Sequence, residues 1–403
     1  MDGSLGRSPV PLDLLPNFTP PKLTGLSLQV TDACNLACSY CYFYEKEPVS
    51  LTREIVDGSL DLLATDGEGS GDWHINLFGG EPTLRPDLLR YICEESARRA
   101  GTLGKKAGFS MTTNGTRFDQ RMLDLVTEFR IATMLSIDGN RKAHDQFRKY
   151  QDGRGSYDKI VANLPWLQQA PYFKVRLTIS PMTVEYLAES IEELLALGIR
   201  NIATSPVVEQ PWTPEHVTEF AAQWQRVGAI YIRERLAGRR LSIKGLDTKD
   251  DTEPLAICAS PSDYGCGAAT TFLFVNAFGD LYPCHRFPGY FGKSPHVRLG
   301  TALTGIDEAK RMHYVLANRA SAKKGCHSFV STEKNSGPCG DCAIQGACGG
   351  SCMAINEFVT GDPTQPPSIP GKLEQIKLAV LSQVYEYLGR HRRENPEMAG
   401  QRR

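Results

Sequence analysis

The sequence predicts an α/β fold, on the strength of three observations. Six short apolar runs, rich in β-branched residues, are spaced between about residues 24 and 207. Segments with helical spacing of apolar residues separate these runs, and a cysteine-rich segment with little periodicity follows. Six strand–helix units in series favour a parallel sheet with outer helices, either an open doubly wound sheet or a full or partial barrel. Ligands of such sheets bind beyond the carboxyl ends of the strands.

The six runs are the expected strands. They span residues 26–30, 74–78, 108–112, 131–137, 174–179 and 199–204. Between the last two runs, Val184, Leu187 and Ile191 share one face of a predicted helix, and Gly198 is its expected end. A second helix is expected around residues 88–93, between the second and third runs.

Two longer helices are predicted in the second half of the chain. Thr213 suits an N-cap and Pro214 suits the first helical position, so a helix should run from there to about residue 237. A last helix is predicted from five apolar residues that share one face. These are Leu373, Ile376, Val380, Val384 and Leu388.

Composition excludes several classes of partner. The chain has 403 residues, with 45 basic and 46 acidic side chains and a formal net charge of −1. This balance gives no electrostatic footprint for a nucleic acid or an anionic membrane. The first 21 residues lack the basic and apolar regions of a signal peptide, and no apolar run is long enough to span a bilayer. The expected location is therefore the cytoplasm.

The twelve cysteines are unevenly distributed, with three at positions 34–41, one at 93 and eight between 258 and 352. In a large chain without an export signal, such clusters indicate metal binding rather than disulfides. Cys93 is the exception, because it lies beside Leu89 on the apolar face of a predicted helix. It is expected to be a buried core residue.

Cys34, Cys38 and Cys41 follow the first predicted strand with C-x3-C-x2-C spacing. A [4Fe–4S] cube has four irons that usually take cysteine thiolates, so three thiolates leave one iron open to a ligand. A zinc site and a redox-active cysteine pair are the alternatives. The zinc site would need a fourth nearby ligand, and the pair would have no use for Cys34.

Gly79, Gly80 and Glu81 lie at the end of the second predicted strand. Paired glycines allow a ligand to approach the backbone closely, and the glutamate is suited to accept hydrogen bonds from an ammonium group. Such a triplet is most often a simple turn. Here it lies one strand–helix unit after the three cysteines, on the same edge of the sheet.

With these motifs, the first 207 or so residues resemble the radical S-adenosylmethionine (radical SAM) enzymes. The resemblance implies a partial (β/α)6 TIM-like barrel and a cluster whose open iron binds the methionyl amine and carboxylate of the cofactor. It implies that Gly79, Gly80 and Glu81 contact the amine. Reductive cleavage of the sulfonium would then yield a 5′-deoxyadenosyl radical that abstracts hydrogen from a substrate.

Further cofactor contacts follow from the same resemblance. Ser110, in the string Ser-Met-Thr-Thr-Asn-Gly, is expected to contact the ribose, and Arg148 is expected to pair with the methionyl carboxylate. Tyr40 and Tyr42 flank the last cysteine, where the family often has aromatic residues near the adenine. Packing of the loop is an equally open explanation for both tyrosines.

The eight late cysteines resemble a SPASM domain, a module with two auxiliary [4Fe–4S] clusters. The first part fits C-x12-G-x4-C through Gly279, and the last fits C-x2-C-x5-C-x3-C. The resemblance implies two ligand sets, with Cys326 standing in for a ligand that the family takes from beyond the final motif. These sets are Cys258, Cys266, Cys284 and Cys352 for one cluster, and Cys339, Cys342, Cys348 and Cys326 for the other. One or two zinc ribbons are the alternative.

The expected organisation follows from these motifs. It comprises an N-terminal extension at 1–23, a radical SAM barrel at 24–237, a linker at 238–256, the auxiliary-cluster domain at 257–365, and a helix and tail at 366–403.

The auxiliary pattern directs the expected substrate towards a peptide or protein. Anaerobic sulfatase-maturing enzymes have an aspartate after the cysteine that closes the first auxiliary motif, but this chain has His285 there. Its Cys-His-Arg-Phe string looks more like maturases of ribosomally made peptides, oxidoreductases that install thioether or carbon–carbon cross-links. Formylglycine formation and other oxidative peptide modifications, such as backbone excision and oxidative decarboxylation, are the alternatives. His285 and, more weakly, Asp280 are candidate bases; contact with a cluster sulfur and simple packing are the alternatives for His285.

The resemblance also suggests partners. An electron donor such as flavodoxin or ferredoxin is expected. Because the cluster motif begins at residue 34, an N-terminal leader-binding module is not expected, so a separate protein presents the peptide or the enzyme recognises it directly. An alternative function of a different class is electron transfer by a non-catalytic iron–sulfur protein. Such a protein would need neither an open iron nor Glu81.

Overall fold

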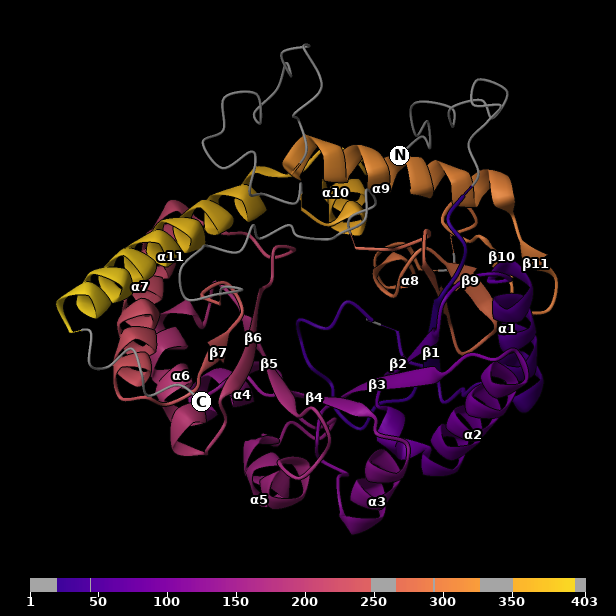
Figure 1. Cartoon of the computed structure of the whole chain (residues 1–403), viewed down its shortest axis with the longest axis horizontal. Coiled ribbons are helices and arrows are strands. Elements are labelled where there is room, and N and C mark those ends of the chain that lie inside the picture. Colours follow the sequence, from indigo (N-terminus) through magenta and orange to yellow (C-terminus); the bar gives the residue numbers. More distant parts are fainter. Residues whose placement is uncertain (1–19, 44, 248–265, 293, 327–350, 396–403) are drawn as a thin grey trace.

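The computed structural model describes residues 20–43, 45–247, 266–292, 294–326 and 351–395. Its centre is one eleven-stranded sheet in the order β11-β10-β9-β8-β1-β2-β3-β4-β5-β6-β7. Figure 1 shows this sheet curving through the molecule with helices along its outer side. Among the described helices, none is long and apolar enough to cross a membrane.

Strands β1 to β6 form the parallel part of the sheet, each pairing with the next along the chain. They are β1 (Gly25–Thr31), β2 (Trp73–Gly79), β3 (Ala107–Thr113), β4 (Ala132–Ser136), β5 (Lys174–Ile179) and β6 (Asn201–Pro206). The six strands expected from the sequence are thereby confirmed, with ends that differ by two residues at most. A short seventh strand, β7 (Ser242–Ile243), pairs with β6 within the segment predicted to be a linker.

Helices follow the strands as the α/β pattern predicts, and they cover the outer side of the sheet (Figure 1). They are α1 (Arg53–Asp66), α2 (Pro86–Thr102), α3 (Gln120–Glu128), α4 (Arg141–Phe147), α5 (Tyr157–Leu167), α6 (Leu187–Ala196) and α7 (Pro214–Leu236), with 3-10 turns η2 (Pro82–Leu84) and η3 (Val184–Tyr186). Cys93 in α2 is fully buried, which confirms it as a core residue.

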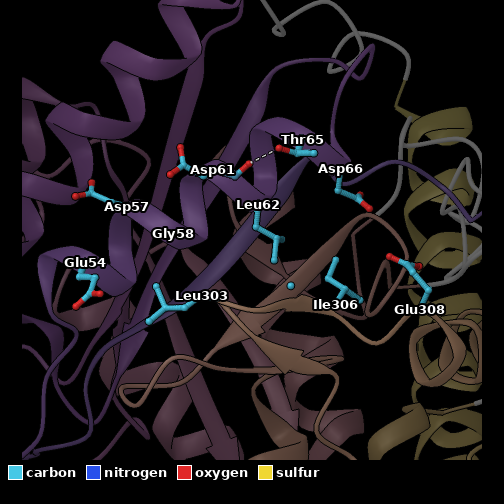
Figure 2. A pocket seen from close by; sticks show the side chains of 12 residues that line it. Glu54, Asp57, Gly58, Asp61, Leu62, Thr65, Asp66, Leu303, Ile306 and Glu308 are labelled. Atoms are coloured by element: carbon cyan, nitrogen blue, oxygen red, sulfur yellow. Dashed lines mark hydrogen bonds between the residues drawn. The ribbon is translucent and has the colours of Figure 1, made fainter.

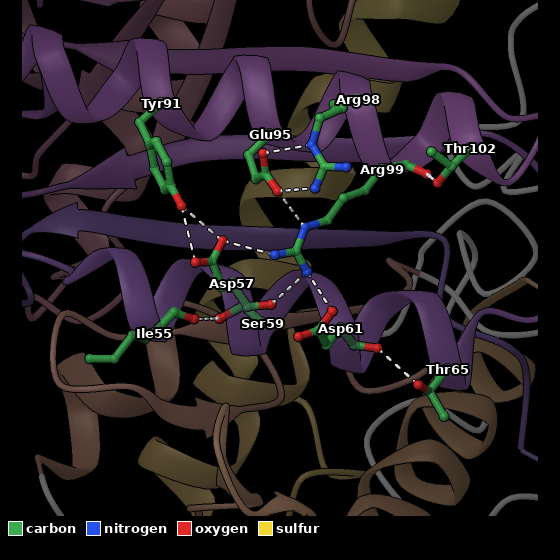
Figure 3. A network of polar contacts seen from close by, with 10 residues as sticks. All are labelled: Ile55, Asp57, Ser59, Asp61, Thr65, Tyr91, Glu95, Arg98, Arg99 and Thr102. Atoms are coloured by element: carbon green, nitrogen blue, oxygen red, sulfur yellow. Dashed lines mark hydrogen bonds and ion pairs between the residues drawn. The ribbon is translucent and has the colours of Figure 1, made fainter.

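The outer surface of α1 and α2 is joined by an ionic network around Arg99 (Figure 3). The Arg99 guanidinium of α2 donates to Asp57 and Asp61 of α1 and to Glu95 of its own helix, and Tyr91 also donates to Asp57. Surface ion pairs contribute little individually. Arg99 is only 18% exposed, however, so this network holds the two helices that cover β1 and β2 in a defined arrangement.

The inner face of the sheet is polar. In β5, Val175, Leu177 and Ile179 are buried, while the alternating Arg176 and Thr178 line a cavity on the other face. This alternation follows from the two-residue period of a strand. Strand β5 therefore buries its apolar side chains against the helices and presents hydrogen-bonding groups to the cavity.

The cysteine-rich half continues the same sheet. Strand β8 (Phe272–Val275) pairs in parallel with β1, and β9 (Asp280–Tyr282), β10 (Gly300–Thr301) and β11 (Gly305–Ile306) follow as an antiparallel meander. The remaining helices are α8 (Arg286–Phe291), α9 (Glu308–Cys326), α10 (Met353–Thr360) and α11 (Ser368–Glu394). The domain boundaries expected from the sequence remain predictions.

Two contacts attach these late elements to the barrel. Arg311 of α9 is almost fully buried and donates to Asp66 of α1 at 2.7 Å and to the Pro21 carbonyl at 2.7 Å. Helix α11 lies along α7 (Figure 1), where Gly228 leaves room for Val380. The predicted apolar face of α11 is confirmed, because Leu373, Val380, Val384 and Leu388 are buried and Ile376 packs against the core.

Candidate active site

The loop after β1 carries three thiols, and the neighbouring elements hold it in place. Its backbone N–H groups at Ala37 and Ser39 donate to carbonyls at the end of α4, and the Asn114 side chain after β3 donates to Asn35 at 2.9 Å. Cys34, Cys38 and Cys41 all line one cavity of about 160 Å³. The three thiols therefore share one wall of a cavity at the carboxyl end of the sheet.

Gly79 and Gly80 fit tightly against this loop. A Cβ atom at Gly80 would lie 2.2 Å from the Ala33 carbonyl oxygen and 2.5 Å from that of Asp32. Gly79 has a φ of +149° and would place a Cβ 2.4 Å from the Thr31 oxygen. The glycines let the end of β2 approach the backbone of the cysteine loop, which is a packing role as well as a route for ligand approach.

Glu81 is buried and accepts four hydrogen bonds. Its Oε1 accepts from the backbone and hydroxyl of Thr83, at 3.1 and 2.6 Å, and from the Thr113 hydroxyl at 2.7 Å. Its Oε2 accepts from the Asn114 backbone N–H at 2.6 Å. Burial raises the pKa of this carboxyl, although these hydrogen bonds oppose the shift. Glu81 thus joins β2 to β3, and within the described residues Oε2 keeps room for a further donor.

Arg148 and Asp138 form a buried ion pair beside the thiols. Arg148 donates to both Asp138 oxygens, at 2.8 and 3.2 Å, and to the Thr178 hydroxyl at 3.2 Å. Tyr40 also donates to Asp138, and the guanidinium lies 5.2 Å from the centre of the Tyr40 ring. Arg148 counts among the charges that stabilise the Cys38 thiolate. Its other face lines the cavity.

Lys46 completes the positive surroundings of the thiols. Its Nζ donates to the Leu36 carbonyl at 3.1 Å. Burial works against its charge, but Cys41, Cys34 and Cys38 in their ionised form, together with Asp32, would outweigh burial and raise the pKa of Lys46. Burial raises the pKa of Cys34 to about 12, so this thiol stays protonated until a metal displaces the proton.

The opposite wall of the cavity comes from the late half of the chain. Arg286 of α8 donates to Glu209, after β6, and both line the cavity. Tyr290 donates to the same glutamate, and the Arg286 guanidinium lies 5.4 Å from the centre of the Tyr42 ring. The elements that follow β8 therefore close the cavity that the cysteine loop opens.

A second set of thiols lies behind that wall. Burial first, and then the thiolates of Cys352 and Cys266, raise the pKa of Cys284. Cys352 likewise acts on Cys266 and on Arg286. Within the described part of the chain, no three Cys, His, Asp or Glu side chains surround a single-ion site.

Comparison with known proteins identifies the domain that carries the cysteine loop. Residues 28–221 match the family model described as the Radical SAM superfamily. The chain contains a radical SAM domain. The match begins within β1, so it includes the cysteine loop, and it ends in α7.

Relatives extend the likeness over most of the chain. The mycofactocin maturase MftC of Mycolicibacterium smegmatis is 25% identical over 362 residues, which cover 85% of this chain and 81% of the relative. An AdoMet-dependent heme synthase of Methanosarcina barkeri is 24% identical over 358 residues, covering 84% and 93%. The structure of anSMEcpe with bound AdoMet and the Cp18Cys peptide superposes with a TM-score of 0.69 at 18% identity, covering 90% of this chain and 99% of that one.

The residues of the radical SAM domain fit its cofactor and cluster. Three thiols, the cations Lys46, Arg148 and Arg176, and the carboxylate of Glu81 line one cavity. Tyr42 also lies there, packed 5.0 Å from the Phe43 ring, and Tyr40 is fixed by Asp138. The cavity thus combines three thiols suited to a [4Fe–4S] cube with a cation suited to the methionyl carboxylate. It also contains a hydrogen-bond acceptor suited to the methionyl amine.

Ser110 and Asp280 lie apart from this cavity. Ser110 is in the middle of β3, where it donates to Asn76 at 3.1 Å and contacts His74, and it is absent from the cavity lining. Asp280 of β9 pairs with Arg298 at 3.3 Å and is also absent from the lining. Their proposed roles in ribose binding and proton transfer gain no geometric support.

His285 lies among aromatic rings next to the cavity. Its ring centroid is 4.8 Å from that of Phe78 and 5.9 Å from that of Tyr42. Burial, with the charges of Arg286 and Arg176, lowers the pKa of His285 to about 3. The ring is therefore neutral near pH 7, and its contacts are those of a packed side chain.

The remaining predicted ligands lie outside the described residues or side chains. Cys258, Cys339, Cys342 and Cys348 fall outside the described ranges, and Cys326 ends α9 without a described side chain. The two auxiliary ligand sets therefore remain predictions. The three described members of the first set, Cys266, Cys284 and Cys352, are close enough to influence one another's ionisation.

Sequence reasoning missed five charged residues of this site. They are Lys46, Asp138, Arg176, Glu209 and Arg286. Asp138 directly follows the β4 strand, and Glu209 follows β6, so the rule that sites lie at the carboxyl ends of strands could have identified both. Arg176 is a charged residue inside a predicted strand, which is itself a signal. Nothing in the sequence pairs Arg286 with Glu209.

A larger groove lies away from the thiols (Figure 2). It has a volume of about 880 Å³ between α1 and the β10–β11 hairpin, and Leu62, Leu303 and Ile306 form its apolar part. Most of its acids already have partners: Asp57 and Asp61 pair with Arg99, and Asp66 pairs with Arg311. The smaller cavity, which holds the reactive groups, is the candidate active site.

Proposed function

We propose that this radical SAM enzyme abstracts a hydrogen atom from a residue of a peptide or protein, and that an oxidative carbon–carbon or thioether cross-link results. One observation carries the proposal. Cys34, Cys38 and Cys41 share a cavity with Arg286, which stands next to the late thiols Cys284 and Cys352. A radical-generating site and a second iron–sulfur site would then face the same substrate.

The comparisons support a peptide as substrate. The relative that covers most of this chain at 25% identity is named a maturase, and the superposed anSMEcpe structure holds a peptide. A heme synthase at 24% identity shows that related chains also serve another substrate class. The late cysteine pattern, which resembles that of peptide-modifying enzymes, favours the peptide here.

The residues of the cavity have distinct proposed tasks. When bound, S-adenosylmethionine and the first cluster supply a radical that abstracts hydrogen, and auxiliary clusters supply an acceptor for the surplus electron. Cys34, Cys38 and Cys41 would hold the first cluster, Glu81 would accept a hydrogen bond from the methionyl amine, and Arg148 would pair with the methionyl carboxylate. Asp138 keeps the Arg148 guanidinium in place through two hydrogen bonds.

Formation of the new bond also releases a proton. His285 and Asp280 are the proposed bases, and His285 is the nearer of the two to the cavity, through Tyr42 and Phe78. Two partners complete the proposal. One is a reductant such as flavodoxin or ferredoxin, and the other is a separate leader-binding protein if the peptide needs presentation.

The experiment combines the reconstituted enzyme, S-adenosylmethionine and dithionite with the peptide encoded beside its gene. Cross-linking predicts a product lighter by two hydrogen atoms, with one 5′-deoxyadenosine formed per link. A formylglycine residue in the product would instead indicate the chemistry of sulfatase maturation. Formation of 5′-deoxyadenosine without any change in the mass of the peptide would contradict a peptide cross-linking function.

A further inference from the structure

Arg176 lines the candidate active site without a carboxylate partner among the described residues. It lies in β5, between buried Val175 and Leu177, and its guanidinium lines the cavity. Its one hydrogen bond within the described residues is to the Ser205 hydroxyl of β6, at 2.8 Å. No carboxylate of the described chain lies within ion-pair distance of it.

Three other arginines inside the described part of the molecule have carboxylate partners. Arg148 pairs with Asp138 at 2.8 Å, Arg286 pairs with Glu209, and Arg311 pairs with Asp66 at 2.7 Å. A guanidinium removed from water without a counter-charge is costly. Among the described residues, the lack of a carboxylate partner thus distinguishes Arg176 from the other two arginines of the cavity, Arg148 and Arg286.

The position of Arg176 distinguishes it from Arg148. Arg148 is the arginine whose charge acts on the Cys38 thiolate of the cysteine loop. Arg176 interacts electrostatically with Tyr42, His285 and Arg286 on the side of the late thiols, and also with Arg148 and Tyr40. Because its hydrogen-bond partner Ser205 lies on β6, the strand that precedes Glu209, an anion bound at Arg176 would lie beside the wall that Glu209 and Arg286 form.

We propose that Arg176 and Ser205 form a carboxylate-binding subsite that holds an acidic group of the peptide substrate. The group is a C-terminal carboxylate or the side chain of an aspartate or glutamate. A guanidinium binds such a group through two parallel hydrogen bonds, which fixes both its position and its orientation. The subsite rests on the proposed function, and it names the chemical class of peptide that the enzyme selects.

The test uses two matched pools of short synthetic peptides and the reconstituted full chain with S-adenosylmethionine. One pool has free C-terminal carboxylates with Asp and Glu; the other has C-terminal amides with Asn and Gln instead. The wild type should bind the acidic pool with a Kd about tenfold lower than that of the neutral pool. Arg176→Gln should remove this preference, and Arg176→Lys should retain part of it. Arg121→Gln, at an exposed surface pair, is the matched control and should behave as wild type.

The carboxylate bound at Arg176 could come from the peptide or from the methionyl group of S-adenosylmethionine, and the affinity for S-adenosylmethionine distinguishes the two. This affinity should be unchanged in Arg176→Gln. A loss of cofactor affinity with an intact peptide preference would overturn the proposal, because the guanidinium would then serve the methionyl carboxylate. A wild type without any preference would overturn it as well.

A second variant keeps the test decisive. Ser205→Ala removes only the hydrogen bond to the guanidinium, so it should reduce the preference severalfold even if Arg176→Gln fails to fold. An unchanged preference in Ser205→Ala would contradict its part in the subsite. Failure of the proposed function looks different, because the acidic pool would then be retained while no peptide changes in mass.

Discussion

Asp138 is the residue on which the cofactor side of the cavity depends. Besides the Arg148 pair, its oxygens accept from the Tyr40 hydroxyl and from the Thr178 backbone N–H at 2.9 Å. It is 2% exposed. One buried carboxylate therefore joins the cysteine loop, α4 and β5.

Replacement of this carboxylate should be strongly destabilising. Asp138→Asn leaves Arg148 buried without its counter-charge, and breaking a buried pair in this way costs about 3–5 kcal/mol. The urea midpoint, measured by circular dichroism under anoxic conditions, should fall accordingly. In the control Asp158→Asn, which breaks a solvent-exposed pair with Arg141, the urea midpoint should stay close to that of the wild type. Equal shifts of the urea midpoint in the two variants would contradict a larger contribution of the buried pair to stability.

At this scale the sequence identified reactive residues better than their partners. The thiols at 34, 38 and 41 are recognisable because their spacing is local. Arg148 was singled out as well, but its pairing with Asp138 depends on how α4 folds back over the end of β4. The roles of Arg176 and Glu209 depend on contacts with side chains of other elements, which the local sequence does not reveal.

At the scale of the elements, the contact between the end of β2 and the cysteine loop holds the loop in position. Gly80→Ala should displace the loop, because its Cβ has backbone oxygens at 2.2 and 2.5 Å. We expect the purified variant to lose about four irons per chain relative to wild type, the content of one cube. Iron analysis and the spectral response to S-adenosylmethionine measure this loss.

Gly101→Ala in α2 is the matched control, because the added Cβ meets no atom within 4 Å. Alanine is favoured over glycine in a helix, so this variant should retain all its iron and be slightly more stable. Full iron content and normal cofactor binding in Gly80→Ala would contradict the packing role of the glycine.

Strand periodicity predicted β1 to β6 because each run is followed by its own helix. The same reasoning could not place β8. Its four residues lie in a cysteine-rich segment, and its partner β1 is more than two hundred positions earlier in the chain. Such long-range pairing depends on the whole sheet rather than on a local pattern.

For the molecule as a whole, the two groups of thiols should hold separate clusters. The double variant Cys284→Ala with Cys352→Ala should lose about four of roughly twelve irons per chain, while S-adenosylmethionine still perturbs the spectrum of the first cluster. Metal analysis and that spectral change are the measurements. Zinc in the wild type, lost in this variant while iron is retained, would identify the late cysteines as zinc ribbons.

The most direct test of the radical SAM assignment is formation of 5′-deoxyadenosine by the reconstituted, reduced chain supplied with S-adenosylmethionine. The wild type should form it, and the triple variant Cys34→Ala, Cys38→Ala, Cys41→Ala should not, because the thiols that line the cavity would be gone. A wild type that holds its full iron yet leaves S-adenosylmethionine uncleaved would contradict the account and favour an electron-transfer protein.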